Sequence, residues 1–459
     1  MTQIADKETH RNHCFYEYLK NERLFYPVDT IENILLSIKV KPFLIFSGGT
    51  GTGKTKIAQM YGRFISSNEE EYAIANTTVT LNKADTNNGF TLSADDFFNK
   101  LPYDGRKADG TYKIKIGKLE TDCTIKLSPR LWYKPNVQSF RDEINDLKKQ
   151  GKNKETLTIF IPKKSMDGSN YEIIPVGSNW TENRFIIGYK NVLTSKYSST
   201  KSLDLIVRAN KNTSEPYLLV LDEMNLSHVE RYFSDILSAM ESGEAIELDS
   251  DGTDVPKKIE LSGNLIIIGT VNVDETTYAF SPKVLDRANV IEFETIPVSE
   301  IISQLSNNDK PDGDIEYLDN CTAGLEVRQK NATAIKDEIC SISSNIPIFD
   351  ELICDLDLMQ KMMDGVNLSF GFRTINEIFR FMYVSWVYKN RGTFVSWKRF
   401  FDAQIKQKIL PKIHGNLSIK ETLQSLFELC SKKGYVTSAN KLEKMIETLE
   451  KQRYVSFNN

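Results

Sequence analysis

FLIFSGGTGTGKTKIAQMYGRF, residues 43–64, carries the most specific structural pattern in the chain. It opens with apolar residues of strand type, continues with glycines and threonines, and closes with apolar residues at helical spacing. Gly48 and Gly53 lie five positions apart and are followed directly by Lys54 and Thr55. This spacing is the pattern of a phosphate-binding loop between a strand and a helix. The stretch therefore predicts a site for a nucleoside triphosphate.

The residue types in this loop fit phosphate chemistry. Glycines allow backbone amides to converge on phosphate oxygens at a helix N-terminus, where the helix dipole favours negative charge. Lys54 is expected to reach the β and γ phosphates, and Thr55 is expected to bind Mg²⁺. The alternative is a chance glycine turn, but the flanking strand and helix patterns favour the loop. The residues expected to contact the nucleotide are Gly48, Gly49, Thr50, Gly51, Thr52, Gly53, Lys54, Thr55 and Lys56.

A second landmark is SEPYLLVLDEMNLSHVERYFSDILSAMESGE, in which the apolar run 217–221 ends at Asp222 and Glu223. An acid at the carboxyl end of a parallel strand lies beside such a loop. We therefore expect Asp222 to hold the magnesium shell and Glu223 to polarise the attacking water. An acidic pair also occurs at ordinary strand ends, and it is the loop that favours the catalytic interpretation.

Three more side chains are candidates for catalysis. The apolar strand pattern LIIIGTVN ends in Asn272, which is suited to position the lytic water, or else simply forms a turn. Arg287, in KVLDRAN, and Arg373, in SFGFRTINEI, are candidates for stabilising charge on the transferring phosphoryl group. Arg287 would act from a neighbouring subunit and Arg373 from a helical lid. Single arginines are more often surface salt-bridge partners, and that alternative stays open for both.

The order of the patterns predicts an α/β fold. Strands that alternate with helices predict a parallel sheet. Asp222 follows Thr55 by 167 residues, which is too long for one connection. Part of that gap has strands and a helix of its own, so we expect an inserted small α+β domain, with a β-barrel-like domain as the alternative. The expected parts are 1–79 (N-terminal helix and loop), 80–174 (inserted domain), 175–296 (rest of the core) and 297–459 (helical lid and C-terminal region).

Composition limits the class of protein. The chain has 459 residues, 40% of them hydrophobic and 26% charged, which is average for globular proteins. No apolar run approaches the length of about 18 residues that a membrane helix needs. The N-terminus is polar, so we expect a cytoplasmic protein without a membrane partner. The six cysteines form no CxxC pair and only four histidines are present, which argues against a structural zinc site or a disulfide framework.

Charge is unevenly distributed along the chain. The net charge is -4, but residues 81–171 carry 17 Lys+Arg and 12 Asp+Glu, an excess of +5, which leaves -9 for the rest. We hypothesise that the inserted domain contacts DNA, with lysines neutralising phosphates and aromatic rings stacking on a base. The alternative is that the aromatics build its core and the charge is a solvated face. The aromatic residues concerned are Phe97, Phe98, Tyr103, Tyr112, Trp132 and Tyr133.

Several segments together resemble the McrB-like branch of the AAA+ superfamily: KPFLIFSGGTGTGKTKIAQ, NWTENRFIIGYKN, YLLVLDEMNLSHVERYFSDILSAMESGE, GTVNVDETTYAFSPKVLDRA, FGFRTINEI and QIKQKILPKIHG. The resemblance implies an AAA+ P-loop core that uses Mg²⁺, a hexameric ring and a preference for GTP. It also implies a separate McrC-like nuclease subunit, within a modification-dependent restriction system for phage defence.

Two departures from the McrB-like pattern affect these expectations. The best-known members carry a DNA-reading domain before the core, whereas only about 40 residues precede the loop here. They also carry Asn-Thr-Ala-Asp where this chain has Asn272, Val273, Asp274 and Glu275, which keeps ATP as the alternative to GTP.

No nuclease centre is visible in the sequence, so any DNA cutting is expected of a partner. Turnover is expected to be slow alone and stimulated by a partner, because some catalytic charge must come from outside the subunit. One rival is an ATP-dependent protein-remodelling AAA+ chaperone whose insertion grips a polypeptide. Another is a signalling switch that hardly hydrolyses its nucleotide, against which Glu223 and Asn272 argue.

Overall fold

The computed structural model describes residues 14–66, 72–80, 91–92, 110–127, 131–135, 138–152, 154–162, 169–253, 255–273, 278, 280–295 and 310–457. The chain forms two compact units. We call Met1–Ser66 with Asn170–Asn459 the main unit, and Ser67–Ser169 the inserted unit.

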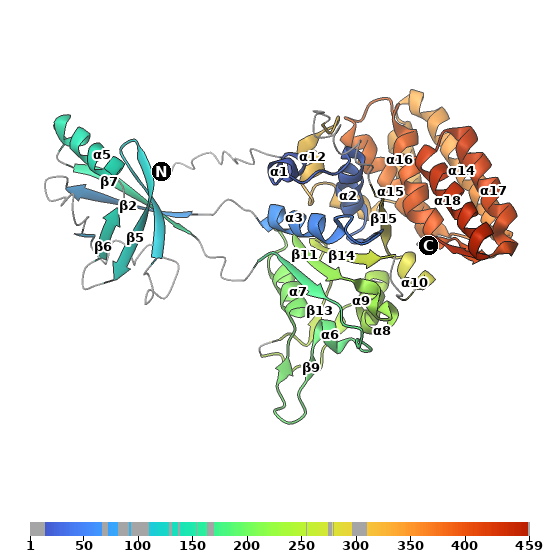
Figure 1. Ribbon diagram of the computed structural model, residues 1–459, viewed down its shortest axis with the longest axis horizontal. Helices are drawn as coiled ribbons and strands as arrows, with labels where there is room; N and C mark the ends of the chain where they lie inside the picture. The colour runs from blue at the N-terminus through green and yellow to red at the C-terminus, as the bar shows by residue number, and fades with distance from the viewer. Residues whose placement is uncertain are drawn as a thin grey trace. The chain divides into compact units, whose positions relative to one another are not determined.

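The main unit is built on a five-stranded sheet with the order β15-β1-β14-β11-β8 (Figure 1). Every neighbouring pair of strands is parallel. The strands are almost entirely buried, as expected of a parallel sheet that is covered on both faces. Gly48, at the end of β1, pairs with Asn272 of β14 and with Phe293 of β15. The strand bounds are β1 Phe43–Gly48, β8 Tyr171–Pro175, β11 Tyr217–Asp222, β14 Leu265–Asn272 and β15 Asn289–Phe293.

Helices cover both faces of this sheet. The connections from β1 to β8 and from β8 to β11 cross the sheet in opposite directions, so right-handed crossovers put α3 and α7 on opposite faces. Figure 1 shows α3 on one side and α7 and α9 on the other. On α3, Ile57, Met60 and Tyr61 are fully buried at three- and four-residue steps, which explains why this segment is an amphipathic helix. The bounds are α2 Val28–Val40, α3 Lys54–Ser66, α7 Lys201–Lys211 and α9 Ser234–Ser242.

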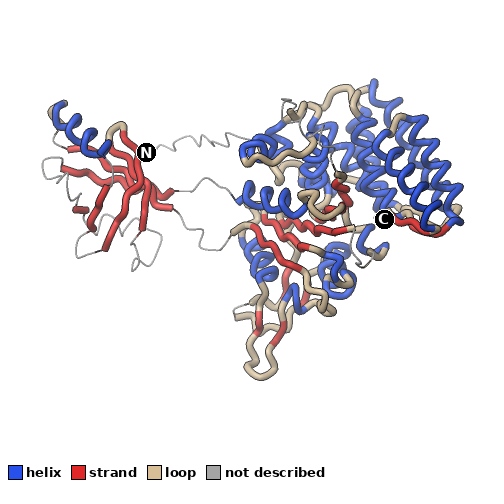
Figure 2. Tube along the Cα trace, viewed as in Figure 1, coloured by secondary structure: helices blue, strands red, loops and turns tan. Residues whose placement is uncertain are grey.

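The C-terminal part of the main unit is helical (Figure 2). Its central helix, α15, packs against α13, α16 and also α2, so the helical region is joined to the sheet region through a helix next to β1. Large side chains such as Phe381 and Trp386 fill the space between these helices. The longer helices are α13 Ala332–Cys340, α14 Ile346–Asp364, α15 Phe372–Tyr388, α16 Trp397–Gln404, α17 Lys420–Lys433 and α18 Val436–Gln452.

Short elements complete the main unit. The helices are α1 Phe15–Asn21, α6 Arg184–Ile187, α8 Val229–Tyr232, α10 Pro282–Leu285 and α12 Ile315–Asp319, and the 3₁₀ or π turns include η2 Met224–Leu226, η3 Leu325–Gln329, η5 Ile405–Ile409 and η6 Leu410–Lys412. Three small antiparallel two-stranded sheets pair β9 Tyr189–Lys190 with β10 Tyr197–Ser198, β12 Ile246–Glu247 with β13 Lys258–Ile259, and β16 His414–Asn416 with β17 Tyr454–Ser456.

The inserted unit is an antiparallel sheet with the strand order β2-β7-β4-β5-β6-β3 and one helix, α5. Gly117, in the turn between β4 and β5, has φ +56°, a conformation that favours glycine. Leu147 of α5 is buried, as is Ile116 at the end of β4. The bounds are β2 Tyr72–Thr80, β3 Thr91–Leu92, β4 Gly110–Ile116, β5 Leu119–Leu127, β6 Leu131–Pro135, α5 Gln138–Lys149 and β7 Lys154–Pro162.

The predicted α/β class with a parallel sheet is confirmed, and so is helix after residue 297 for the residues described there. The boundaries of the insertion differ from the expected 80–174. Residues 72–80 pair with β7 inside the inserted unit, whereas 171–175 form the edge strand of the parallel sheet. The physical reason is that a strand belongs to the sheet that satisfies its backbone hydrogen bonds, which the local pattern does not specify.

Candidate functional site

The loop between β1 and α3 depends on its glycines. A Cβ on Gly48 would lie 2.4 Å from the carbonyl oxygen of Phe293. Gly53 has φ +88°, and a Cβ there would lie 2.6 Å from the hydroxyl oxygen of Tyr26. Thr52 donates its hydroxyl proton to the carbonyl oxygen of Gly49 at 2.9 Å, which tightens the turn. Larger residues at 48 and 53 would force the loop out of this shape.

Lys54 begins α3, and its side chain folds back over the loop. It is 4% exposed, and its ammonium donates to the carbonyl oxygens of Gly48 at 2.8 Å and Gly49 at 2.6 Å. The hydroxyl of Thr52 lies 3.3 Å from the same nitrogen. A buried ammonium must be surrounded by oxygen atoms, and this loop supplies them. The positive charge is thus held at the helix N-terminus, where the dipole also attracts anions.

Thr55 and Asp222 meet although 167 residues separate them. The Thr55 hydroxyl donates to Oδ1 of Asp222 at 2.6 Å, and the Thr270 hydroxyl donates to the same oxygen at 2.7 Å. Within the described residues, Oδ2 of Asp222 makes no hydrogen bond. A hydroxyl beside a carboxylate with a free oxygen is a donor set that suits Mg²⁺. The sequence prediction that these two residues share one site is consistent with this geometry.

Glu223 follows in a left-handed backbone conformation, with φ 54° and ψ 48°. Its amide donates to the Thr270 hydroxyl at 3.0 Å, and one of its carboxylate oxygens lies 3.4 Å from the side-chain nitrogen of Asn272. Asn225 in turn approaches the carbonyl oxygen of Asn272 at 3.5 Å. Left-handed backbone is unfavourable for a residue with a side chain, and such strain gathers at functional sites. Asp222, Glu223 and Asn272 therefore lie together at the carboxyl edge of the sheet.

Arg287 and Arg373 lie together elsewhere. Each pairs with one carboxylate oxygen of Glu241, at 2.6 Å for Arg373. Arg287 is buried and also donates to the carbonyl oxygens of Leu237 and Lys283, at 3.1 and 2.6 Å. Arg373 keeps 41% of its side chain exposed. Neither arginine contacts the phosphate loop.

A cavity of about 1050 Å³ connects Asn272 to this arginine pair. Asp286 lies in its wall and pairs with Arg373 at 3.0 Å and Lys412 at 2.6 Å. Burial raises the pKa of the Asp286 carboxyl, but Lys412, Lys408 and Arg373 outweigh burial and hold it below its usual value. The wall of this cavity thus carries charged groups of both signs.

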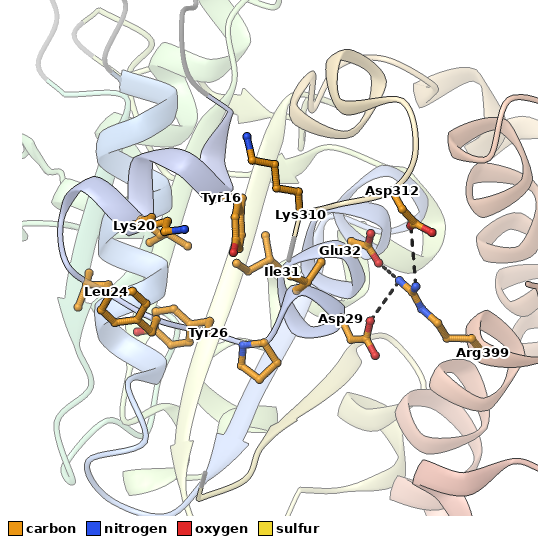
Figure 3. Close-up of a pocket in the computed structure, with 14 residues that line it drawn as sticks. Tyr16, Lys20, Leu24, Tyr26, Asp29, Ile31, Glu32, Lys310, Asp312 and Arg399 are labelled. Carbon is orange, nitrogen blue, oxygen red and sulfur yellow. Dashed lines mark ion pairs between the residues drawn. The ribbon is translucent and has the colours of Figure 1, made fainter. Parts of the chain in front are cut away.

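A second cavity, of about 440 Å³, lies beside the loop (Figure 3). Tyr26 lines it and donates its hydroxyl proton to the carbonyl oxygen of Gly53 at 3.0 Å; burial raises the pKa of Tyr26 to about 12. On the opposite side, Arg399 of α16 pairs with Asp29 at 3.3 Å, Asp312 at 4.0 Å and the buried Glu32. Aromatic, aliphatic and ionised groups thus surround one cavity next to the loop.

The remaining predicted residues are exposed or are not described. Thr50, Gly51 and Lys56 are exposed on the loop and on the first turn of α3. Phe97, Phe98, Tyr103, Asp274 and Glu275 lie outside the described residues, as do the side chains of Tyr112, Trp132 and Tyr133. Sequence reasoning missed Tyr26, Glu241, Thr270 and Arg399. Thr270 alone had a signal, because it precedes Asn272 by two residues and alternate residues of a strand share a face.

Comparison with known proteins gives one partial match. The profile of a family described as a domain of unknown function (DUF8727) matches residues 326–454, which is the helical region of the main unit and well under half of the chain. No curated protein matches the chain. Among the helices in the described ranges, none is long and apolar enough to cross a membrane. Across the same part of the chain, no three His, Cys, Asp or Glu side chains cluster as a metal site would require.

Proposed function

We propose that the protein hydrolyses a nucleoside triphosphate at the loop between β1 and α3. The observation that carries this proposal is the 2.6 Å contact between Thr55 and Asp222, which joins the loop to the acid pair of β11. A hydroxyl after the loop lysine and an acid at the end of a neighbouring parallel strand are the residues that hold Mg²⁺ in P-loop nucleotide hydrolases. The carboxyl edge of a parallel sheet is also where such folds bind ligands.

The side chains have distinct roles in this proposal. Lys54 would exchange its contacts with loop carbonyls for the β and γ phosphates, and the loop amides would bind phosphate oxygens. Thr55 and Asp222 would hold Mg²⁺, which neutralises charge on the phosphates. Glu223 would accept a proton from the attacking water, and Asn272 would orient that water.

The base of the nucleotide would occupy the 440 Å³ cavity beside Tyr26. We favour GTP, with ATP as the alternative. Asp29 and Asp312 place carboxylates in the cavity wall, and each carboxylate that pairs with Arg399 keeps lone pairs that can accept further hydrogen bonds. The edge of guanine offers two adjacent N–H donors, whereas the corresponding edge of adenine offers one amino group. This complementarity supports the GTP preference that the resemblance to McrB-like proteins implies.

The AAA+ assignment, the hexameric ring and the arginine roles are part of the same proposal. Arg373 is the better placed of the two arginines to meet a phosphoryl group, since its side chain is 41% exposed and lines the cavity that reaches Asn272. Arg287 is buried and occupied by its own chain. A nucleotide bound to a neighbouring subunit would therefore contact Arg373 before Arg287. Arg373 would first have to break its ion pair with Glu241.

The proposed biological role is that of a DNA-associated motor in a McrBC-like defence system, with a McrC-like nuclease subunit as partner. The inserted unit is the proposed DNA contact. Its described side chains include exposed Lys115, Lys118 and Lys154, none of which forms an ion pair within the described residues. Exposed lysines without acidic partners are available to neutralise DNA phosphates.

The test is steady-state hydrolysis of GTP and of ATP by the full chain with Mg²⁺. We expect turnover that Lys54→Ala abolishes, because the loop then lacks its cation. Stimulation by duplex DNA or by the nuclease subunit supports the motor role, whereas stimulation by unfolded protein supports a remodelling chaperone. Turnover that is unchanged in Lys54→Ala would contradict the assignment of the site.

A further inference from the structure

Thr270 is a buried hydroxyl at the carboxyl edge of the parallel sheet. It lies on β14 between β1 and β11, and it is 2% exposed. The residues before it on β14, from Leu265 to Gly269, are apolar or glycine. Burying a hydroxyl in such a strand is unfavourable unless it is hydrogen-bonded. The position therefore calls for an explanation in terms of what the hydroxyl contacts.

Both hydrogen-bonding capacities of this hydroxyl serve the acid pair. Its proton is donated to Oδ1 of Asp222 at 2.7 Å, and its oxygen accepts the amide proton of Glu223 at 3.0 Å. A hydroxyl has a single proton, so the carboxylate fixes its direction and leaves the lone pairs to the amide. One side chain thus holds two consecutive residues of β11 from the neighbouring strand.

The two hydrogen bonds of Thr270 hold the side chain of Asp222 and the backbone of Glu223 in conformations that the chain would not keep by itself. Glu223 has a left-handed conformation, which surrounding contacts must maintain because it is unfavourable for a glutamate. Asp222 shares Oδ1 between Thr270 and Thr55, so its carboxylate plane is fixed on both sides. Its other oxygen is then oriented without using the metal or the nucleotide to do so.

We propose that Thr270 is the positioning residue of the acid pair: it orients the carboxylate of Asp222 toward the metal and holds Glu223 in its left-handed turn. This inference rests on the proposed hydrolysis. Thr270 would not touch the nucleotide. Its effect would pass through Asp222 to Mg²⁺ affinity and through Glu223 to the activation of water.

The test compares Thr270→Val with Thr270→Ser in the full chain. Valine keeps the shape and β-branching of threonine but can neither donate nor accept, whereas serine keeps the hydroxyl. For Thr270→Val we expect kcat to fall by at least about tenfold and the Mg²⁺ concentration for half-maximal turnover to rise by about threefold or more, with the KM for nucleotide within about twofold. Thr270→Ser should keep kcat within about threefold of the original protein.

A purely structural role would give a different pattern. It would lower the melting temperature and the fraction of active protein in both variants, without changing the Mg²⁺ dependence of the active fraction. Unchanged kcat and Mg²⁺ dependence in Thr270→Val would overturn the inference, as would equal loss in Thr270→Ser. If the original protein does not hydrolyse nucleotide at all, the proposed function fails first and the positioning role fails with it.

Discussion

At the scale of single residues, Glu223 is the side chain on which the proposed chemistry depends most. It directly follows Asp222, has a left-handed backbone, and lies within reach of Asn272. A carboxylate next to the acid proposed to bind Mg²⁺ can accept a proton from water without taking part in nucleotide binding. Binding and hydrolysis should therefore be separable at this position.

For Glu223→Gln we expect hydrolysis to fall by about 100-fold or more, because the amide cannot accept the proton, while nucleotide affinity changes by less than about threefold. Single-turnover hydrolysis and equilibrium binding of a fluorescent nucleotide measure the two quantities. Glu244→Gln is the matched control, since Glu244 is exposed and lies outside the site. Equal loss of binding and hydrolysis in Glu223→Gln would mean that Glu223 holds the nucleotide or the fold instead.

The sequence predicts some of these residues and not others, for a physical reason. The sequence identifies the loop residues Gly48, Gly53, Lys54 and Thr55 by their local spacing, because a phosphate-binding loop is one contiguous motif. The sequence places Thr270 on the same strand face as Asn272, but its role is recognisable only from its contacts with Asp222 and Glu223 on the neighbouring strand. Tyr26 has no local signal at all, because it lies in the segment before α2 and its hydroxyl meets Gly53 only in the folded chain.

At the scale of elements, a buried ionic cluster joins the helical region to the sheet. Glu377 of α15 pairs with Lys41, just before β1, and with Lys408 of η5 at 2.6 Å. Lys408 also donates to the carbonyl oxygen of Ala288 at 2.8 Å, and Lys41 donates to that of Asp286 at 3.1 Å. Burial and the nearby Lys408 lower the pKa of Lys41 to about 7. Glu377 is thus the shared partner of two buried lysines, of which Lys41 is fully charged only below neutral pH.

Removing the Glu377 carboxylate should destabilise the main unit. We expect Glu377→Gln to lower the free energy of unfolding of the main unit by about 3 kcal/mol at pH 6, below the pKa of Lys41, because two buried lysines then lose their shared carboxylate. Urea denaturation followed by tryptophan fluorescence measures this, with exposed Glu428→Gln of α17 as the control. A loss no larger than that of the control would show that the cluster is not what holds the helical region in place.

The same substitution has a predictable pH dependence. Burial raises the pKa of Glu377, but Lys408 and Lys41 outweigh burial and lower it below the usual value. A carboxyl with a lowered folded pKa contributes stability that is fully present above its unfolded pKa of about 4.3 and is lost as pH falls through the folded value. The stability difference between the original protein and Glu377→Gln should therefore persist at pH 5 and shrink in stronger acid.

Helices and strands with a strong local hydrophobic pattern can be predicted from the sequence. The sheet to which a strand belongs is harder to predict, because it depends on pairing with distant residues. The apolar run before Asp222 matches β11 because a strand buried on both faces is a continuous apolar run, and the pattern after Gly53 matches α3 because a helix buried on one face has a helical period. The predicted boundaries of the inserted domain, near residues 80 and 174, are wrong. The reason is that β2 and β8 belong to different sheets, which only their pairing partners reveal.

At the scale of the whole molecule, the inserted unit is the proposed link to DNA. The register of β4 with β7 puts the Gly117–Lys118 turn and the start of β7 at the same end of the antiparallel sheet. The topology therefore places Lys154 at the same end of the sheet as Lys115 and Lys118, although Lys154 is distant from them in sequence. A group of lysines at one end of a sheet can contact several phosphates together.

For the triple change of Lys115, Lys118 and Lys154 to Gln, we expect weaker binding to duplex DNA and a shallower salt dependence. Each lost phosphate contact should reduce the slope of log K against log salt by about 0.9. Fluorescence anisotropy with the full chain at several salt concentrations measures both. Lys398→Gln, in the helical region, is the control. An unchanged slope would place DNA binding elsewhere or exclude it.

We propose that Lys54, Thr55, Asp222 and Glu223 surround one magnesium-bound triphosphate. The most direct test is an experimental structure of Glu223→Gln with Mg²⁺ and GTP. The claim predicts phosphate oxygens within about 3 Å of the Lys54 nitrogen. It also predicts Mg²⁺ about 2.1 Å from the Thr55 hydroxyl, with Asp222 in direct or water-mediated contact. Nucleotide bound away from the loop, or a metal that neither Thr55 nor Asp222 contacts, would contradict it.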